Sequence, residues 1–329
     1  MRDFGLGILE DDNNSDFLSH HKNILYINPE SGVKFYNVSH DYFQGKDLDT
    51  HKRLDYSIGV EYLNDLEEKK TPHEWRISKS DVFFNRKEPS LVFEEISMLL
   101  MNVIYPINIS TDRHGKVIEI VNHKEIVDRW PLVKKKLLQE YRSDLVFKLI
   151  KKFDKLIKNP TKLEIAVTKE IFWSLFFSKK YQEYGSSCKK KTEAFFSIEP
   201  YKTPLVYNGY MEFNPKISEH ETIKLEYTAQ TVIPKHSKLY YKRKEHKLTS
   251  ELEISYDLDI TTKLPIYIKA SCDIYDETKS EDISQIQTLI TLDETRTEKE
   301  NRLAKEKKES IPLKEETPKK KKWFSFGFK

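Results

Sequence analysis

The chain has 329 residues, with 56 Lys and Arg against 53 Asp and Glu and a formal net charge of +3. This near-balance argues against a whole-chain polyanion binder, so nucleic-acid binding is not expected and any charged site must be local. Nine glycines are too few for folds built on repeated glycine turns, and they disfavour a phosphate-binding loop. The two cysteines, Cys188 and Cys272, are predicted to be reduced thiols.

The sequence also bears on localisation. No apolar run reaches the ~18–20 residues that cross a bilayer as a helix. Acidic residues occupy the N-terminal segment where a signal peptide would need an apolar stretch. We therefore expect a cytoplasmic protein, with peripheral attachment at the inner face of the membrane as an open alternative.

The N-terminal part predicts a β-sheet. Lys22–Asn28 and Val33–Val38 have the composition of short strands around a turn. Residues 54–62 alternate between apolar and polar side chains, the period of a strand with one wet face. Trp75–Ser78 and Val82–Phe84 are predicted to continue the sheet.

The middle of the chain changes to a helical period. Leu91–Met101 is apolar around most of its circumference and predicts a buried helix. A second helix is expected to begin after Asn122 and to be kinked or divided by Pro131. A third is predicted to be capped by Ser143, and a fourth to open at Asn159–Pro160.

The period of two returns after Gly185, with short turns between apolar stretches, and this predicts an antiparallel meander. Its strands are expected at residues 206–213, 222–232, 248–260, 265–275 and 283–292. Thr261–Lys263 is the clearest turn, and Gly115 is predicted to supply a positive φ in an earlier hairpin.

The predicted fold class is therefore α+β. Antiparallel N-terminal strands and the C-terminal meander, in one curved sheet or two, pack with a central group of about four helices. This body covers residues 1–293, with a sub-boundary placed near residue 186. Residues 294–322 predict a charged disordered linker because apolar content falls away, and residues 323–329 form an aromatic C-terminal peptide.

Sequence patterns of known catalytic and metal sites are missing: there is no His-Glu-x-x-His, no Cys-x-x-Cys and no Gly-x-Ser-x-Gly. His114 and His123 could hold a metal only with a carboxylate such as Glu119 or Asp128, and solvent-facing histidines are the favoured interpretation. We therefore expect no enzymatic activity, no metal and no cofactor.

A secondary basic patch is predicted within residues 235–247, where cations alternate with tyrosines as in single-strand nucleic-acid binding surfaces. An exposed hairpin end is the favoured interpretation, since the charge balance speaks against a polyanion partner. Asp257 and Asp259 share one face of a strand, and simple solvation is preferred over acid/base work. The residues of the patch are Lys238, Tyr240, Tyr241, Lys242, Arg243 and Lys244.

The C-terminal tail is the most informative segment, because a block of lysines runs directly into four aromatic side chains. Such lysines are attracted to an anionic leaflet, and aromatic rings settle at the headgroup level. Alternatively, an extended aromatic peptide docks in a groove or at a sheet edge of a protein partner. An inert tail is the third interpretation. The residues are Lys319, Lys320, Lys321, Lys322, Trp323, Phe324, Phe326 and Phe328.

Residues Ile104–Trp130, IYPINISTDRHGKVIEIVNHKEIVDRW, precede a helical pair and the meander. Together they resemble a family of uncharacterised bacterial proteins, some of them associated with contractile-injection or type VI-like secretion loci. The resemblance covers about residues 90–293 and does not include the tail. It implies an accessory or adaptor role and carries over no catalytic residue.

The function predicted from the sequence is a non-enzymatic intracellular scaffold or adaptor, recruited through its tail to a protein partner or a membrane surface. One alternative is a carrier of an apolar ligand within a curved sheet, lined for example by Tyr256 or Tyr275. Another is a hydrolase whose site is assembled from residues scattered along the chain. The oligomeric state is not predicted.

Overall fold

The computed structural model describes residues 23–45, 48, 50–63, 73–199, 203–240, 246–279 and 281–309. Helices occur in the middle of the chain and at its end, and strands occur on both sides of the middle group. The strands are β1 (Gly32–Gln44), β2 (Thr50–Tyr62), β3 (His73–Phe84), β4 (Ile107–Thr111), β5 (Val117–Ile120), β6 (Lys189–Phe196), β7 (Leu205–Phe213), β8 (Thr222–Val232), β9 (Leu248–Asp259), β10 (Pro265–Asp276) and β11 (Glu281–Leu292).

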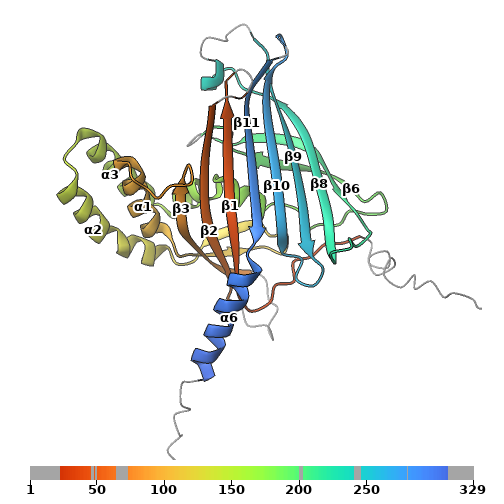
Figure 1. Ribbon diagram of the computed structural model, residues 1–329, viewed down its shortest axis with the longest axis horizontal. Helices are drawn as coiled ribbons and strands as arrows, with labels where there is room; N and C mark the ends of the chain where they lie inside the picture. The colour runs from red at the N-terminus through yellow and green to blue at the C-terminus, as the bar shows by residue number, and fades with distance from the viewer. Residues whose placement is uncertain are drawn as a thin grey trace, which may run out of the picture.

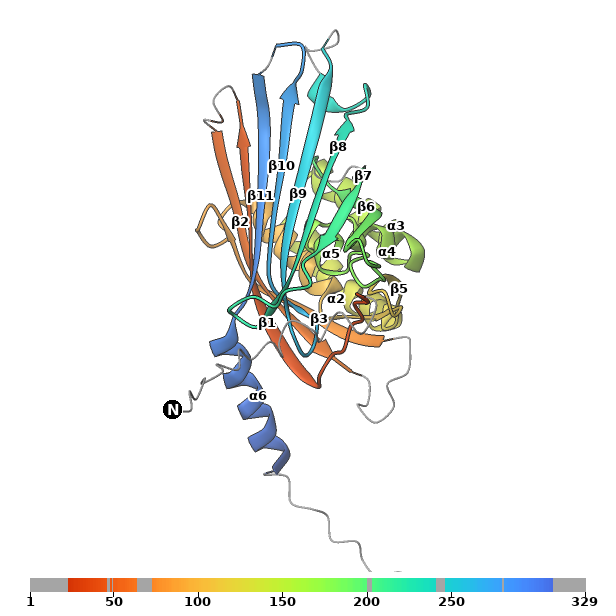
Figure 2. The same ribbon diagram turned by 90° about the vertical axis from the view of Figure 1, so that its right-hand side faces the viewer.

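The helices are α1 (Val92–Ile104), α2 (His123–Glu140), α3 (Asp144–Ile157), α4 (Pro160–Thr168), α5 (Ile171–Phe176) and α6 (Glu294–Glu309), with a short 3₁₀ turn η4 (Lys238–Tyr240). Figures 1 and 2 show a strongly curved sheet with α5 held inside the curve, while α1 to α3 project beyond the β3 side. Among the described residues, no helix is both long and apolar enough to cross a membrane.

The strands of the described residues form one antiparallel sheet, in the order β5-β4-β3-β2-β1-β11-β10-β9-β8-β7-β6. The N-terminal strands and the meander are joined because β1 pairs with β11, from Tyr36 opposite Leu292 to Gln44 opposite Ser284. The sequence did not decide between one curved sheet and two separate sheets. The described strands form one sheet. The meander is confirmed for β8 to β11, whose neighbours in sequence are neighbours in the sheet.

The inner face of the sheet is the apolar one. Along β9, the inward side chains Leu252, Ile254, Tyr256 and Leu258 are all buried, whereas Asp257 lies on the outer face. The predicted period of two and the wet face of Asp257 are thus confirmed. The turn at residues 261–263 is also confirmed, since the Asp259 carboxylate accepts hydrogen bonds from the backbone of the turn.

Helix α5 fills the curve of the sheet with aromatic side chains. Trp173 is 2% exposed, donates a 3.1 Å hydrogen bond to the hydroxyl of Tyr105 and stacks on Phe177 at 5.3 Å between ring centroids. Phe176 meets Tyr36 of β1 edge to face at 5.1 Å. Large rings in such contacts contribute most of the apolar area that a core removes from water, so α5 is the centre of the fold.

Some predictions about the helices were right and others were wrong. Ser143 and Asn159 do cap α3 and α4, each accepting a hydrogen bond from a first-turn amide. The helix predicted to be buried, α1, begins instead with an exposed stretch, and Phe93 is 56% exposed. Pro131 neither ends nor divides α2, which continues to Glu140.

Two strand predictions also need correction. The predicted strand Lys22–Asn28 is reduced to a single bridge between Ile24 and Glu183, within a segment that crosses to the α5–β6 connection. Strand β6 was missed, because the lysines of Lys189–Lys191 hid its alternation. The hairpin at Gly115 is confirmed, with φ +79° at the glycine.

The predicted disordered linker is wrong over its first half, because residues 294–309 form α6. Asn301 replaces a strand partner for β1: its side-chain oxygen accepts from the Val33 amide at 3.1 Å and its side-chain nitrogen donates to the Val33 carbonyl at 3.0 Å. Thr297 accepts from the Phe35 amide at 2.9 Å. These side chains hydrogen-bond backbone groups of β1 beyond the end of β11. Composition alone does not reveal this contact.

We expect Asn301→Ala to loosen α6 from the sheet. The substitution leaves two partly buried backbone groups of Val33 without partners, a loss of about 1–3 kcal/mol. Amide hydrogen exchange at Val33 and along α6 should accelerate, while exchange in β9 stays unchanged. Arg302→Ala is the matched control, because the Arg302 side chain is 72% exposed. Equal exchange in both variants would contradict this role of Asn301.

Candidate functional site

A buried lysine lies at the centre of the fold, just after α5. Lys180 is 0% exposed, and its ammonium donates to the carbonyl oxygens of Phe176 and Leu175. The ammonium also lies over aromatic rings, at 4.9 Å from the ring centre of Tyr181 and 5.3 Å from that of Tyr256. Burial lowers the pKa of Lys180 to about 7.

A lowered lysine pKa is typical of amines that attack carbonyl groups, so this chemistry has to be considered. The surroundings of Lys180 are closed, however. Tyr181 donates to the Lys263 carbonyl at 3.0 Å, and the hydroxyls of Ser178 and Tyr256 lie 3.2 Å apart. With no exposed surface, the amine has no route to a substrate, and we interpret it as a structural group.

Two further polar clusters are sealed in the same core. The ring of His40 contacts the hydroxyls of Thr288 and Tyr56, both at 2.9 Å, and burial together with the charge of Lys79 lowers the pKa of His40 to about 3. A histidine held neutral in this way does not shuttle protons near neutral pH.

The second cluster contains a free thiol. Cys272 is 0% exposed and lies 3.2 Å from the hydroxyl of Ser250 and 3.4 Å from that of Tyr207. Burial raises the pKa of Cys272 to about 11, so the thiolate needed for nucleophilic attack does not form at neutral pH. Both cysteines are free, as the sequence predicted.

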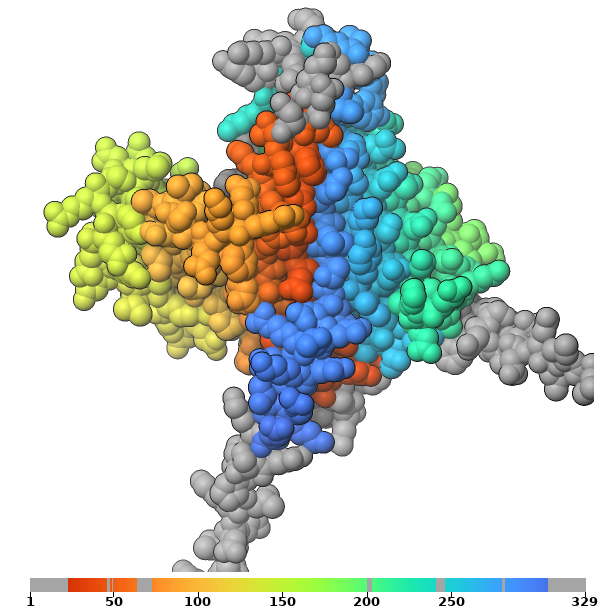
Figure 3. Space-filling model, viewed as in Figure 1, coloured from red at the N-terminus to blue at the C-terminus, as the bar shows by residue number. Residues whose placement is uncertain are grey.

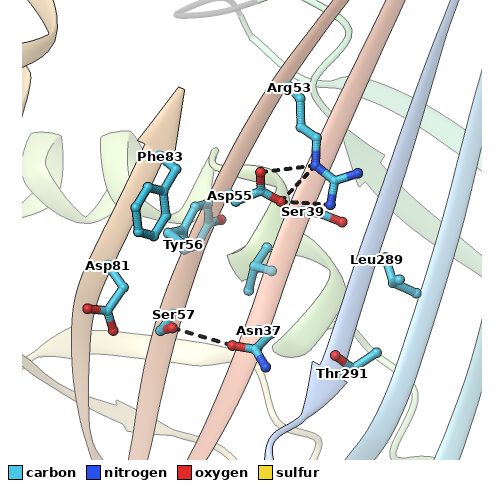
Figure 4. Close-up of a pocket in the computed structure, with 11 residues that line it drawn as sticks. Asn37, Ser39, Arg53, Asp55, Tyr56, Ser57, Asp81, Phe83, Leu289 and Thr291 are labelled. Atoms are coloured by element: carbon cyan, nitrogen blue, oxygen red, sulfur yellow. Dashed lines mark hydrogen bonds and ion pairs between the residues drawn. The ribbon is translucent and has the colours of Figure 1, made fainter. Parts of the chain in front are cut away.

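The outer face carries an open depression of about 340 Å³ over β11, β1, β2 and β3 (Figure 4). Arg53 donates to Asp55 at 2.9 Å and approaches Asp41 at 3.4 Å, so its charge is already paired. Across the depression, hydrogen bonds from Arg296 of α6 and from Ser80 lower the pKa of Asp81. Paired charges on an open face offer no activated acid, base or nucleophile.

The histidines considered as metal ligands are engaged elsewhere. One ring nitrogen of His114 lies 2.7 Å from the Tyr181 carbonyl, and one of His123 lies 2.7 Å from the Ile157 carbonyl. No group of three or more His, Cys, Asp or Glu side chains suited to a metal ion occurs in the described part of the chain. The interpretation of both histidines as solvent-facing is wrong, because both are partly buried. His114 hydrogen-bonds the segment after α5, and His123 hydrogen-bonds the end of α3.

One residue of the secondary basic patch is buried in the structure, contrary to the prediction. Tyr240 is 4% exposed; its hydroxyl donates to the Ile233 carbonyl at 3.2 Å and accepts from the Leu248 amide at 3.1 Å. It is a core side chain and offers no stacking platform, so this residue was wrongly predicted. Lys238 is in η4, and Tyr241, Lys242, Arg243 and Lys244 lie outside the described residues.

The proposed ligand-lining tyrosines do not face a common space. Tyr256 points into the core, where its ring lies beneath Lys180, and it is 1% exposed. Tyr275 lies on the opposite face of the sheet and receives a hydrogen bond from the side chain of Gln230. The sheet curves around α5 and its aromatic neighbours, so these two positions cannot line one apolar pocket.

The tail residues Lys319–Lys322, Trp323, Phe324, Phe326 and Phe328 lie outside the described residues. What the structure does show is the element that leads to them. Helix α6 is fixed to β1 by Thr297 and Asn301, and beyond these contacts it points away from the sheet (Figure 1). Its last side chains up to Glu306 are exposed. The chain therefore leaves the body as a helix.

No protein-family model and no curated protein matches the chain. Among solved structures, one titled "Lipid-protein interactions in lipovitellin" aligns at 8% identity and a TM-score of 0.41, covering 80% of this chain and 25% of that chain. DynF from the dynemicin biosynthesis pathway of Micromonospora chersina aligns at 6% identity and a TM-score of 0.21, covering 82% and 84%. The chain thus spans a quarter of the lipovitellin chain, and at these TM-scores neither likeness carries an argument.

Proposed function

We propose that this protein is a non-catalytic adaptor that attaches to a partner through its basic-aromatic C-terminal segment. The observation that carries the proposal is the direction of α6, which is fixed to β1 at Asn301 and then continues away from the sheet. The eight residues that follow Asn301 in α6 extend about 12 Å at 1.5 Å per residue. Helix α6 thus ends clear of the sheet.

The chemistry of the body is consistent with an adaptor. Its polar clusters around Lys180, His40 and Cys272 are buried, and the charges of the outer depression are paired. A body of this kind supplies a rigid surface, while the tail supplies a short aromatic motif with a basic flank. Recruitment at a secretion or injection apparatus is the setting that the bacterial resemblance suggests.

The test compares the full chain with a version ending at Thr317, each mixed with cell lysate and separately with anionic vesicles. We expect only the full chain to recover a discrete protein or to float with vesicles, because the truncated form lacks the lysines and aromatic rings. Circular dichroism and thermal unfolding of the two forms should coincide. Equal behaviour in both assays would mean that the tail is inert.

Two full-length variants separate the two chemistries of the tail. One changes Trp323, Phe324, Phe326 and Phe328 to Ser, and the other changes Lys319–Lys322 to Ser. Loss in the aromatic variant alone indicates a groove or sheet-edge partner. Loss in both, with strong weakening at high salt, indicates an anionic surface.

A further inference from the structure

Charge is distributed unevenly between the parts of this chain. Residues 123–157, which span α2 and α3, carry ten Lys and Arg against five Asp and Glu, a formal charge of +5. The whole chain carries +3, so the remaining residues together carry −2. The pair α2–α3, which we call the helical arm, is thus basic in a chain whose other residues are together slightly acidic. Figure 3 shows that the arm protrudes from the sheet.

The two helices of the arm form one layer. Asp154 of α3 accepts from the Trp130 indole at 2.6 Å and from the Lys134 ammonium at 2.6 Å, and Trp130 lies 4.7 Å from Phe153 between ring centroids. The inward side of α3 is fully apolar, with Val146, Ile150, Phe153 and Ile157 buried. These inner contacts hold the two helices together, and the outer side of the arm is free to contact something else.

Four large apolar side chains of the arm are exposed. Leu132 and Leu138 of α2 are 77% and 40% exposed, and Leu145 and Phe147 of α3 are 70% and 48% exposed. A single exposed leucine needs no explanation, but four within two adjacent helices are more than a solvated surface requires. Antiparallel packing brings the end of α2 beside the start of α3, where three of these side chains lie.

Lysines cover the face of α3 opposite its buried residues, and Leu145 and Phe147 lie on the two flanks of that face. Lys148, Lys151, Lys152 and Lys155 are exposed along α3, and within the described residues no ion pair engages them. Their helix is about 21 Å long, enough to extend across several lipid headgroups. A basic surface flanked by exposed Leu and Phe suits the headgroup region of an anionic bilayer, where lysines meet phosphates and apolar side chains reach the acyl boundary.

We infer that the exposed side of the helical arm is a docking surface for an anionic lipid surface. The lysines contact the headgroups, and Leu132, Leu138, Leu145 and Phe147 enter the boundary with the acyl chains. A nucleic acid would satisfy the lysines but leave the leucines in water, and so it fits less well. The inference is independent of the tail, because it rests on residues of the body.

The experiment uses the full chain and vesicles of phosphatidylcholine with or without 30% phosphatidylserine, at about 0.1 M and 0.5 M salt. We expect binding only to the anionic vesicles, and weaker binding at the higher salt. Lys148→Glu with Lys151→Glu should lower the affinity roughly 25-fold or more, because each lysine near the surface contributes roughly fivefold. Each new carboxylate faces a lysine one turn on, which supports the helix.

A second variant, Leu145→Ser with Phe147→Ser, removes apolar area without changing charge, and it should lower the affinity roughly tenfold. The matched controls are placed on the sheet. Lys190→Glu with Lys191→Glu repeats the charge change on exposed residues of β6. Val206→Ser with Val232→Ser repeats the apolar change on residues 41% and 55% exposed. Both controls should bind like the unmodified protein.

The tail is tested in the same assay through the variant with Trp323, Phe324, Phe326 and Phe328 changed to Ser. If the tail variant alone loses binding and the arm variants do not, the inference is overturned while the proposed function stands. If only the arm variants lose binding, the inference stands, and the tail does not bind this membrane; the lysate assay then decides whether it binds a protein partner. Absence of binding by the unmodified chain also overturns the inference, as does sedimentation showing that the arm instead joins two copies.

Discussion

Lys180→Met should stabilise the protein at pH 6 and remove a large part of its pH dependence. Lys180 is 0% exposed, and burial lowers its pKa to about 7 from the ordinary lysine value of 10.5. Below pH 7 the lysine is protonated both folded and unfolded, and the folded state bears the full penalty of a buried charge. Between pH 7 and 10.5 only the unfolded state retains the proton, so stability rises with pH.

The size of this effect follows from the difference between the two pKa values. Each unit corresponds to about 1.4 kcal/mol, so stability should rise by about 5 kcal/mol across the window. At pH 6 the methionine variant should be more stable by about 2 kcal/mol, since the carbonyls of Leu175 and Phe176 lose their donor and offset part of the gain. Tyr181 and Tyr256 lie under the ammonium, and Tyr36 packs against Phe176; all three stay neutral in this range, because burial raises the pKa of each.

The measurement is urea unfolding of both proteins at intervals from pH 6 to pH 10. Half-buried Lys263 also has a pKa lowered by burial, but it is present in both proteins and cancels in the comparison. Lys179→Met is the matched control, because Lys179 is the neighbouring residue and is exposed. Its curve should follow that of the unmodified protein. Identical pH profiles for Lys180→Met and the unmodified chain would show that the buried charge is not costly.

Gly209→Ala should destabilise the protein by about 3 kcal/mol or more. A Cβ on Gly209 would lie 2.2 Å from the Thr228 carbonyl oxygen and 2.5 Å from the Cβ of Ala229. These atoms belong to β8, whose backbone is held by β9 at Thr228 opposite Glu253. The clash therefore cannot be relieved by turning a side chain, and β7 has to move away from its neighbour.

Gly185→Ala distinguishes this clash from the general effect of removing a glycine. A Cβ on Gly185 would meet no heavy atom within 4 Å, but its φ is +66°. The expected loss is about 1–2 kcal/mol, from the left-handed backbone alone. Thermal unfolding of both variants compares the two effects. A loss at Gly209 no larger than that at Gly185 would mean that β7 and β8 adjust freely.

The local parts of this fold could be predicted from the sequence. The alternation along Leu252, Ile254 and Tyr256 gave strand β9 because the two faces of the sheet differ sharply in polarity. Ser143 was predicted as a cap, and Asn159–Pro160 as the start of a helix, because these signals depend on residues within one turn. Features that depend only on neighbouring residues can therefore be predicted without a structure.

The parts that could not be predicted depend on distant residues. Lys179 and Lys180 are adjacent and identical in type, and only the packing of β1 and β9 decides that one is buried and the other exposed. The order in α6 depends on Asn301 meeting Val33, so its composition gave the wrong answer. The exposed start of α1 was predicted to be buried, because an apolar helix sequence does not say how much of the helix is covered.

The pairing of β1 with β11 has a consequence for biosynthesis. Tyr36 emerges early from the ribosome, but its partner Leu292 is among the last residues of the body to be made. At bacterial or eukaryotic elongation rates β1 waits for roughly ten to fifty seconds with one edge unpaired. An unpaired edge is a template for association with other chains. The nascent chain should therefore depend on a holding chaperone, and folding should be slow and complete only after the ribosome has released β11.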